Sequence, residues 1–577
     1  MGVFERVARK PRECIRKIEH KEKKKMSRKN RNVPLSKAVL VAALLLVSGL
    51  STRGQSDDAP PGQWRIAGQN LNNSWSQPAE HTISPANVSG LTPKWVFTTG
   101  GDVSATPTVD GNAVYFPDWG GNLFAVEKEN GRLIWSHKIS DYDGVEGAIS
   151  RVSPAVDGNE VIIGDIQSSN KVHNGANVMA VDRQSGTLRW MTKVDDHPAA
   201  IITGSPVIFD GVVYIGVSSS EESLATNPAY PCCSFRGSIV ALNEKNGAIL
   251  WKTFDMPDNG GQVGGYSGGA IWQPPAIDAK RGTLFVGTGN NYTAPADVEA
   301  CQNATPLANC VAADDFFDTA LALDLKTGAI KWSRMLQSFD TWTVACILPG
   351  GATNPNCPVP VSPDFDLGGS GPNLLDNIVG FGQKSGIYWA LNPDNGNIVW
   401  STPVGPGASL GGIEWGTATD GKRIYVAISN SDHLPYTLVP SGQQITWGAW
   451  SALDVATGKI LWQTADPTAG SIDRGSVSVA NGVMYAGANS GQMYALDTTT
   501  GKILWNFASG GSVIDGPSIV DSTLYWGSGY REIAGTGNNK VFAFALAGGK
   551  DHGEHSGDDK GHSGDDNNHG GDQNGKK

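Results

Sequence analysis

The chain has 577 residues, with 45 Lys and Arg against 56 Asp and Glu, and a formal net charge of −11 at pH 7. Residues 1–54 contain 15 of the basic and 4 of the acidic residues, so the remainder holds 30 basic (45 − 15) and 52 acidic (56 − 4) residues, a net charge of about −22. Such an acidic body repels phosphate backbones and anionic lipid, which disfavours nucleic acid and anionic lipid as partners.

The first 54 residues are typical of an export signal. Residues 1–25 are highly charged and precede a second methionine, Met26, which is an alternative start. The basic stretch SRKNRNVPLSK is followed by the apolar run 38–50, which has the length of a signal-peptide core and is too short to cross a bilayer. The cleavage site is not defined by the sequence. We expect residues 1–54 to be a leader and signal peptide, and the mature protein to be periplasmic or secreted without a transmembrane anchor.

One eleven-residue phrase recurs seven times after the leader. Each copy runs from Ala through an aliphatic residue and an Asp, Glu or Asn to an Asn-Gly, Ser-Gly or Thr-Gly pair, and the copies end at Trp135, Trp190, Trp251, Trp332, Trp400, Trp462 and Trp505. The pattern predicts a β-hairpin, because the glycine supplies the positive φ that the turn requires. A single hairpin cannot bury its Trp, so the copies must stack on one another. Spacings of 43 to 81 residues suit the four-stranded blades of a β-propeller.

The two ends of the repeat region predict the number of blades. The segment VFAFAL at 541–546 begins like an eighth copy but lacks the Gly turn and the Trp, whereas Trp95 in KWVF lies 40 residues before Trp135. We expect the N-terminal strand to pair with the last hairpin and close the ring, which removes exposed sheet edges. This predicts an all-β, eight-bladed β-propeller of four-stranded antiparallel sheets over residues 62–547. Seven blades, with Trp95 outside the pattern, is the alternative.

The C-terminal residues 548–577 have a different composition. They consist mainly of Gly, Asp, His, Asn and Lys without an apolar anchor, and such a segment is expected to be disordered. Its histidines could gather a metal, but we favour a solvated tail; they are His552, His555, His562 and His569.

Cysteine usage indicates an oxidising compartment. Cys14 is lost with the leader, and the other six form three near pairs that predict local disulfides: Cys232 with Cys233, Cys301 with Cys310, and Cys346 with Cys357. The sequence contains no CxxCH motif, so it offers no covalent haem site. Electrons, if the protein handles them, must leave through a separate partner.

The long insertions between the second and fifth repeats contain the residues that the repeat does not explain. Glu221 and Glu222 follow the strand sequence GVVYIGVSS, and the adjacent cysteines Cys232 and Cys233 come soon after. Trp272 lies outside the Trp register, so a planar ligand could stack on it. Asn290 follows the strand TLFVGTG and offers a neutral oxygen to a hard cation. Each has a structural alternative: a solvated rim residue for the glutamates and a turn residue for Asn290.

Two carboxylates and a lysine follow in the next insertion. Asp364 and Asp366 flank Phe365, so on an extended backbone they point to the same side. One could bind a cation while the other acts as a base, although paired surface carboxylates are common. Lys384 stands just before the fifth repeat and could face an anionic ligand. Because a ring brings corresponding blade ends together, these groups predict a cation held by acids and an amide, next to a planar anion stacked on Trp272.

At this point the sequence resembles the quinoprotein alcohol dehydrogenases, eight-bladed propellers that hold pyrroloquinoline quinone (PQQ), and within them the polyvinyl alcohol dehydrogenase branch. The likeness covers roughly residues 62–547. It depends on the repeats and on a series of ordered motifs: SSSEE, PCCSFRGSIVAL, GGAIWQPPAID, VGTGNNY, PDFD, GQKSGIYWALNPDNG and GGIEWGTATDGKRIYVAISN.

The resemblance implies a role for each candidate residue. Trp272 would stack on the quinone beside a vicinal Cys232–Cys233 disulfide, and Lys384 would bond its reactive end. Arg151 in RVSP and Thr203 in TGSP would bind its carboxylates. The Ca²⁺ ligands would be Glu222 or its neighbour Glu221, together with Asn290 and Asp364. Asp364 would also be the general base, and Asp366 adds a carboxylate that makes a lanthanide conceivable.

Two features differ from the better-known alcohol dehydrogenases of this family. Their continuous W-D-x-D run is interrupted here, because Thr343 follows Trp342 and the acids come only after the insertion between Cys346 and Cys357. Asp340 or Asp366 could therefore take the role of Asp364. The adjacent cysteines also lie in a different loop from those of the methanol-oxidising enzymes, which fits the polymer-oxidising branch.

These observations lead to a first hypothesis and to alternatives. The first is an exported PQQ-dependent dehydrogenase that oxidises secondary or polymeric alcohols and passes electrons to a separate cytochrome c or other acceptor. A non-catalytic envelope propeller that serves as a scaffold for protein assembly is the second, and a quinoprotein for sugars or aldehydes differs only in substrate. A scaffold would not require Glu222, Asn290 and Asp364 at blade ends together with a vicinal cysteine pair.

Overall fold

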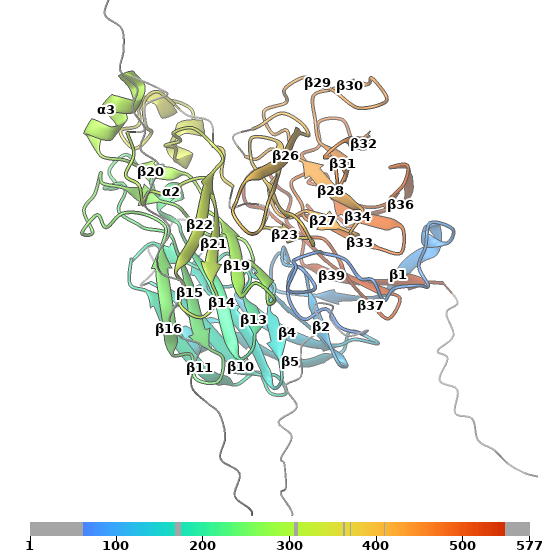
Figure 1. Cartoon of the computed structure of the whole chain (residues 1–577). Coiled ribbons are helices and arrows are strands. Elements are labelled where there is room, and N and C mark those ends of the chain that lie inside the picture. Colours follow the sequence, from blue (N-terminus) through green and yellow to red (C-terminus); the bar gives the residue numbers. More distant parts are fainter. Residues whose placement is uncertain are drawn as a thin grey trace, which may run out of the picture. The chain divides into compact units, whose positions relative to one another are not determined.

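The computed structural model describes residues 62–167, 175–304, 310–361, 364–367, 369, 371–408 and 410–547. The expected leader, residues 1–54, and the expected tail, residues 548–577, lie outside the described residues. Eight antiparallel blade sheets follow one another along the described chain, seven of four strands and one of four strands with an additional short strand (Figure 1). The eight-bladed β-propeller predicted from the repeats is confirmed, and the seven-bladed alternative is wrong.

The first four blades contain the following strands. Blade 1 is β2 (Thr108–Asp110), β3 (Ala113–Pro117), β4 (Asn122–Glu127) and β5 (Leu133–Lys138). Blade 2 is β7 (Ala155–Asp157), β8 (Glu160–Gly164), β10 (Ala176–Asp182) and β11 (Leu188–Asp195). Blade 3 is β13 (Val207–Phe209), β14 (Val212–Ser219), β15 (Ser238–Asn243) and β16 (Ile249–Phe254), with β12 (Ala200–Ile201) also pairing with β14. Blade 4 is β18 (Ala276–Asp278), β19 (Thr283–Gly287), β21 (Thr319–Asp324) and β22 (Ile330–Met335).

The other four blades complete the series. Blade 5 is β23 (Asn373–Leu374), β24 (Val379–Gly382), β25 (Ile387–Leu391) and β26 (Ile398–Pro403). Blade 6 is β27 (Ala418–Thr419), β28 (Arg423–Ile428), β31 (Ala449–Asp454) and β32 (Ile460–Ala465). Blade 7 is β33 (Val477–Ala480), β34 (Val483–Gly487), β35 (Gln492–Asp497) and β36 (Ile503–Ala508). Blade 8 is β37 (Ser518–Val520), β38 (Thr523–Ser528), β39 (Lys540–Leu546) and β1 (Leu91–Thr98).

The repeated phrase forms the outer hairpin of a blade and joins it to the next blade. The indole Nε1–H of Trp462 donates to the carbonyl of Thr498 in blade 7 at 2.9 Å. The ring also covers Gly501, which has φ +70°, and a Cβ built there would lie 2.5 Å from a ring carbon of Trp462. The Gly of the phrase therefore has two roles. It adopts the positive φ that the turn of its own hairpin requires, and its lack of a side chain leaves room for the Trp of the preceding blade. Equivalent indole bonds join Trp95, Trp135, Trp190, Trp251, Trp332, Trp400 and Trp505 to the next hairpin or strand.

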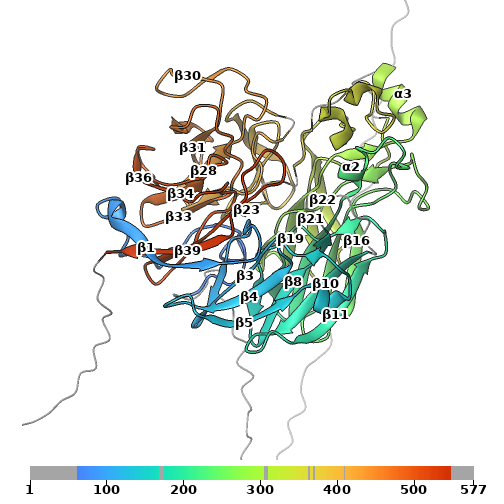
Figure 2. The same cartoon turned by 180° about the vertical axis from the view of Figure 1, so that it is seen from behind.

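The ring closes through the N-terminal strand. β1 pairs antiparallel with β39, the last strand, from Leu91 opposite Leu546 to Thr98 opposite Lys540. The two strands lie side by side in both views, β1 in blue and β39 in red (Figure 1, Figure 2). Trp505 of blade 7 donates its indole N–H to the carbonyl of Leu91 at 3.1 Å. This is the same inter-blade bond as elsewhere, so the first strand completes the last blade.

The elements outside the blades are short. They are the two-stranded sheets of β6 (Ala148–Ile149) with β9 (Ile166–Gln167), β17 (Ser267–Gly268) with β20 (Asn291–Thr293) and β29 (Tyr436–Thr437) with β30 (Gln444–Ile445). The α-helices are α1 (Ser140–Asp143), α2 (Glu221–Leu224) and α3 (Ala296–Ala304), and the 3-10 helices are η1 (Val88–Gly90), η2 (Val344–Ile347) and η3 (Gly351–Thr353). Within the described ranges, none of these helices combines the length and the apolar character that spanning a bilayer requires. The three predicted disulfides are present.

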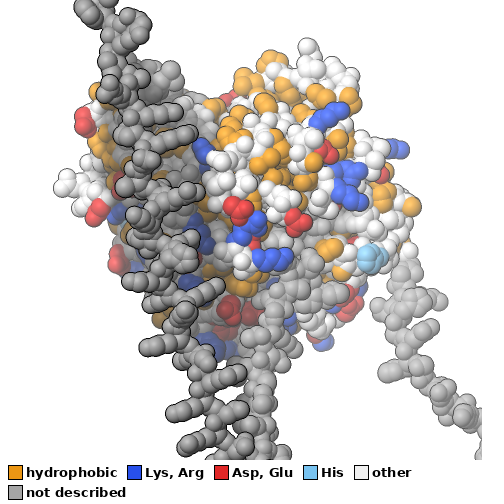
Figure 3. Space-filling model, in the orientation of Figure 1, with side chains coloured by type: hydrophobic (Ala, Val, Ile, Leu, Met, Phe, Trp, Pro, Cys, Tyr) orange, Lys and Arg blue, Asp and Glu red, His pale blue; other side chains and the backbone are white. Residues whose placement is uncertain are grey.

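The described surface carries charged side chains of both signs. On the face shown in Figure 3, basic and acidic side chains are interspersed among hydrophobic and polar ones.

Candidate active site

A cavity of about 230 Å³ gathers most of the predicted site residues. Its lining includes Arg151, Thr203, Glu222, Trp272, Asn290, Asp364, Asp366 and Lys384. Glu221, Cys232 and Cys233 are not among the residues that line it. A larger groove of about 790 Å³ contains none of the predicted site residues and is lined mainly by polar turns of blades 4 to 6. The chemistry therefore points to the smaller cavity.

Blade geometry explains why residues so far apart in sequence meet. β14, β19 and β24 are each the second strand of their blade, and they end at Ser219, Gly287 and Gly382. Glu222, Asn290 and Lys384 follow these ends within two or three residues. Because corresponding strand ends in a propeller face the same side of the ring, the three side chains come together.

A buried lysine joins the two aspartates of the PDFD segment. Lys384 Nζ lies 2.7 Å from Asp364 Oδ2 and 3.0 Å from Asp366 Oδ2. The ammonium group also lies 5.3 Å from the centre of a Trp272 ring. All three charged side chains are less than a tenth exposed. Charges buried to this degree persist only when they are paired, so the three groups form one electrostatic unit.

Burial dominates the ionisation of these groups. It raises the pKa of Asp364 well above its usual range, and the charges of Asp366 and Glu222 add to this although Lys384 opposes it. Burial also raises the pKa of Glu222 to about 8. For Lys384 burial alone lowers the pKa, but the surrounding carboxylates outweigh it and hold the pKa above its usual range. The lysine is therefore a permanent cation among acids that resist ionisation.

The acids outnumber this cation, which fits a site for an additional positive ion. Glu222 Oε1 and Asp364 Oδ1 are buried and have no hydrogen-bond partner among the described residues. Leaving such oxygens bare costs free energy, and an oxygen-seeking cation such as Ca²⁺ would supply the missing partner. Among the described residues, no group of three or more His, Cys, Asp or Glu side chains is arranged to hold a metal ion. The metal ligands therefore stay a prediction.

The side chain of Asn290 is fixed by its surroundings. Its amide nitrogen donates to the carbonyls of Asn291 at 2.8 Å and Trp342 at 2.9 Å. Its backbone N–H donates to Asp366 Oδ1 at 2.6 Å. With both amide hydrogens engaged, the side-chain oxygen is the atom left to accept from, or to coordinate, a ligand.

Arg151 and Thr203 lie at another part of the cavity wall. The guanidinium carbon of Arg151 is 5.3 to 5.8 Å from the ring centres of Trp415, Trp119 and Tyr530. Thr203 shares a 2.7 Å hydrogen bond with the hydroxyl of Ser218. A guanidinium surrounded by rings keeps its N–H groups available for a carboxylate while its flat faces are covered.

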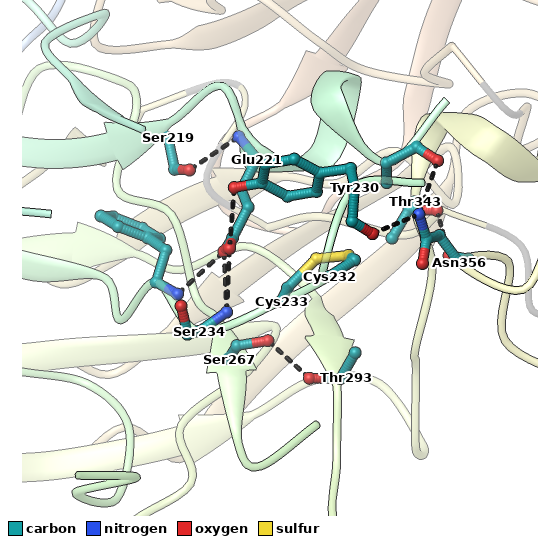
Figure 4. Close-up of a disulfide and its surroundings, with 12 residues drawn as sticks. Ser219, Glu221, Tyr230, Cys232, Cys233, Ser234, Ser267, Thr293, Thr343 and Asn356 are labelled. Atoms are coloured by element: carbon teal, nitrogen blue, oxygen red, sulfur yellow. Dashed lines mark hydrogen bonds between the residues drawn. A yellow bond between two sulfur atoms is a disulfide. The ribbon is translucent and has the colours of Figure 1, made fainter. Parts of the chain in front are cut away.

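Glu221 and the adjacent cysteines belong to the structure beside the cavity (Figure 4). Glu221 accepts hydrogen bonds from the backbone N–H groups of Ser234 and Phe235, which directly follow Cys233. The Cys232–Cys233 disulfide packs close to a second of the three disulfides, Cys346–Cys357. The neighbouring glutamates are thus separated, since Glu222 lines the cavity and Glu221 holds a loop.

Several residues of the site were not singled out from the sequence. Glu414 lines the cavity, is 7% exposed, and has an Oε2 without a partner in the described residues. The next residue, Trp415, has the guanidinium carbons of Arg151 and Arg474 at 5.3 and 5.6 Å from its ring centre. Trp415 lies outside the Trp register as Trp272 does, so the same criterion would have found it.

Two further buried acids, Asp340 and Asp318, lie near these residues, and the sequence indicates only Asp340 as a candidate. Asp340 was named as an alternative base, and its Oδ2 accepts the backbone N–H of Phe365 at 2.9 Å. Asp318 is fully buried, and both its carboxylate oxygens lack a partner among the described residues. The charges of Asp340, Asp366 and Asp364 add to burial in raising the pKa of Asp318. In sequence Asp318 belongs to an acidic loop, DDFFD, which gives no sign that it is buried.

Comparison with known proteins identifies relatives with the same architecture. A family model described as outer membrane protein assembly factor BamB matches residues 88–231, 235–406 and 383–575, and so follows the repeats. The solved quinohemoprotein alcohol dehydrogenase of Comamonas testosteroni has a TM-score of 0.63 at 18% identity, over 85% of this chain and 81% of that one. At this identity the likeness shows the fold alone.

Relatives found by sequence similarity indicate the family more specifically than the structural likeness does. The polyvinyl alcohol dehydrogenase of Sphingopyxis sp. (strain 113P3) is 31% identical over 569 residues, which cover 87% of this chain and 81% of the relative. A polyvinyl alcohol dehydrogenase of Pseudomonas sp. is 32% identical over 388 residues, 65% of this chain and 56% of the relative. The chain therefore belongs to the PQQ-dependent quinoprotein alcohol dehydrogenases, with the polyvinyl alcohol dehydrogenases.

Proposed function

We propose that this chain is an exported dehydrogenase that uses PQQ to oxidise secondary or polymeric alcohols, with electrons passed to a separate cytochrome c or other acceptor. The observation that carries the proposal is the buried Lys384–Asp364–Asp366 unit beside Trp272 in one cavity. The names of the two relatives support a polymeric alcohol as substrate. The absence of a CxxCH motif from the sequence supports a separate acceptor.

The residues of the cavity wall suit the parts of PQQ and a cation. Trp272 offers a flat face to the tricyclic ring, and Arg151 and Thr203 offer donors to its carboxylates. Glu222, Asn290 and Asp364 would hold Ca²⁺, and Asp366 provides a further carboxylate should the ion be a lanthanide. Bound together, PQQ and the cation supply the electrophilic carbonyl that accepts the hydride.

Asp364 is the residue that accepts the alcohol proton. Its Oδ2 is bonded to Lys384, while its Oδ1 has no partner among the described residues, and the two lone pairs of this oxygen could face the cation and the substrate hydroxyl. In Asp366 both oxygens are engaged, by Lys384 and by the N–H of Asn290. Asp340 is not among the residues that line the cavity. These contacts favour Asp364 over the two alternatives.

Lys384 lowers the pKa of Asp364 relative to burial alone, which favours its action as a base. A buried carboxylate without a nearby cation would hold its proton, because burial disfavours the charged form. The ammonium at 2.7 Å counteracts this and fixes the carboxylate through Oδ2. Apolar and aromatic lining residues, among them Ile201, Val344 and Trp342, limit access of water and suit a substrate with a hydrocarbon backbone.

The remaining assignments belong to the same proposal. Residues 1–54 act as leader and signal peptide, with Met26 as the alternative start, and direct the protein to the periplasm or the medium. Residues 62–547 form one propeller domain. Mass spectrometry of the protein recovered from the periplasm tests the leader directly, because a processed N-terminus near residue 54 is expected.

Reconstitution tests the activity. The mature chain is loaded with PQQ and Ca²⁺, or with a lanthanide in a parallel sample, and mixed with 2-propanol, 2,4-pentanediol or polyvinyl alcohol and an artificial electron-accepting dye. We expect bound quinone by absorbance and alcohol-dependent dye reduction. A protein that binds no quinone and reduces no dye with any alcohol would instead be the non-catalytic scaffold that the repeats also allow.

A further inference from the structure

We propose that Glu221 is a positioning residue that holds the metal-facing Glu222 and the Cys232–Cys233 turn in a fixed relation. The proposal rests on the proposed function, since it assigns Glu222 and not Glu221 to the cation. It separates two adjacent glutamates that the sequence alone leaves interchangeable.

The carboxylate of Glu221 is fully engaged by the loop that follows α2. Oε1 accepts from the backbone N–H of Ser234 at 2.9 Å and from the hydroxyl of Tyr230 at 3.2 Å. Oε2 accepts from the backbone N–H of Phe235 at 2.8 Å. The side chain is 1% exposed, and Figure 4 shows it reaching toward Ser234 beside the disulfide. These bonds leave Glu221 little capacity to bind an ion.

The same residue fixes the backbone from which Glu222 extends. The N–H of Glu221 donates to the hydroxyl of Ser219, the last residue of β14, at 2.8 Å. Glu221 is also the first residue of α2, and its carbonyl accepts the N–H of Ala225 at 2.9 Å. Glu222, the next residue, lines the cavity with an unpartnered Oε1. Movement of Glu221 would therefore move this oxygen.

The far side of the disulfide turn is held by a second loop. The side-chain amide of Asn356, next to Cys357, donates to the carbonyls of Ala225, Asn227 and Tyr230 at 3.0 to 3.2 Å. Asn354 adds bonds to the carbonyls of Ala225 and Thr226. The turn is thus tied to the Cys346–Cys357 loop on one side and to Glu221 on the other. Mutation of a residue that orients a metal ligand without itself binding the metal typically lowers metal affinity 10- to 100-fold.

A carboxylate is required at this position for a chemical reason. Three donors converge on its two oxygens, and an amide of the same shape has one oxygen and one NH₂ group. In Glu221→Gln the NH₂ group would face an N–H donor of the loop. The turn would then shift or leave a buried donor unpaired, while the volume of the side chain stays the same.

A matched variant separates positioning from general stability. Glu80 is also buried, and its carboxylate accepts the backbone N–H groups of Thr82, Ile83 and Ser522 at 2.6 to 3.1 Å, but it does not line the cavity. Glu80→Gln therefore removes the same kind of bond at a site without a role in cation binding.

The experiment titrates Tb³⁺ into the cofactor-free chain and records its luminescence, with Tm and hydrogen exchange measured in parallel. We expect Glu221→Gln to weaken Tb³⁺ binding 10- to 100-fold and to speed exchange at Ser234 and Phe235. Glu222→Gln should weaken binding at least as much without changing that exchange, and Glu80→Gln should lower Tm without changing binding.

Two results would overturn the positioning role. One is a loss of Tb³⁺ affinity in Glu221→Gln no larger than in Glu80→Gln. The other is a loss in Glu221→Gln with unchanged exchange at Ser234 and Phe235, which would make Glu221 a ligand. A wild-type chain that binds no Tb³⁺ would contradict the proposed metal site itself, and exchange in Glu221→Gln would then still show whether the tether exists.

Discussion

Lys384 Nζ lies 2.7 Å from Asp364 Oδ2, and the two residues come from different segments, Asp364 from the connection between blades 4 and 5 and Lys384 from the turn that follows β24. The contact is buried, so each partner stabilises the charge of the other. Removing one partner of such a pair typically costs about 3–5 kcal/mol, because the remaining charge is left without compensation. The pair therefore holds the two segments together. It also fixes Asp364, the proposed general base, in the cavity.

Replacing the base should abolish turnover while the fold is retained. In Asp364→Asn the isosteric amide cannot accept the alcohol proton, so we expect the dye-linked rate of the reconstituted enzyme to fall about 10²- to 10⁴-fold. Circular dichroism should be unchanged. Asp473→Asn is a matched control, because Asp473 is also fully buried and has an unpartnered Oδ2, but does not line the cavity. Activity that survives in Asp364→Asn places the base elsewhere, with Asp366 the first candidate.

The metal-free protein should lose stability as the pH rises. Burial raises the pKa of Asp165 and of Asp315 to about 7 and that of Glu222 to about 8 in the folded chain. In the unfolded chain these groups titrate near 4. Between pH 4 and 8 the folded state therefore binds more protons, and stability decreases with increasing pH through this window.

Thermal unfolding in the presence of a chelator checks this sign. Tm should be higher at pH 5.5 than at pH 8, and Asp315→Asn should flatten the profile because it removes one of the titrating groups. Added Ca²⁺ should raise Tm most at pH 8, where it replaces the lost protons at Glu222. A Tm that increases steadily up to pH 8 would contradict the buried, proton-binding state of these acids.

Trp272 should contribute to cofactor affinity more than to stability. It is half-buried in the cavity wall and lies outside the repeated phrase whose tryptophans join neighbouring blades. Trp272→Leu removes a stacking face worth about 1 kcal/mol beyond its area, so the Kd for PQQ should rise about fivefold or more. Quenching of the remaining Trp fluorescence by PQQ measures this. Trp190→Leu, which loses an inter-blade bond to Glu244, should lower Tm and leave the Kd unchanged.

Trp505 should hold the ring closed. Trp505→Phe keeps most of the aromatic packing but removes the bond to the carbonyl of Leu91, at a cost of about 1 kcal/mol. We expect faster hydrogen exchange in β1 and β39 and a lower Tm. Trp447→Phe is the control, since its indole bond to the carbonyl of Asp466 lies within blade 6. Equal exchange in β1 for both variants would mean that the strand pairing alone closes the propeller.

The sequence was sufficient for the architecture because the repeat encodes its own packing. Each phrase carries a Trp that needs a neighbour and a Gly that admits the neighbour's Trp, so the number of copies and the position of Trp95 predicted eight blades and their closure. The eight predicted residues that line the cavity follow the same logic, since most of them stand just beyond strand ends, and strand ends meet around a ring.

What the sequence could not decide was how neighbouring side chains divide their contacts. Glu221 and Glu222 are chemically identical, and only the position of the Ser234 and Phe235 N–H groups turns one into a tether and leaves the other facing the cavity. Likewise Asp318 and Glu414 became part of the site through burial against loops distant in sequence. Local patterns determine strands and turns, whereas the environment of a single carboxylate depends on contacts between blades.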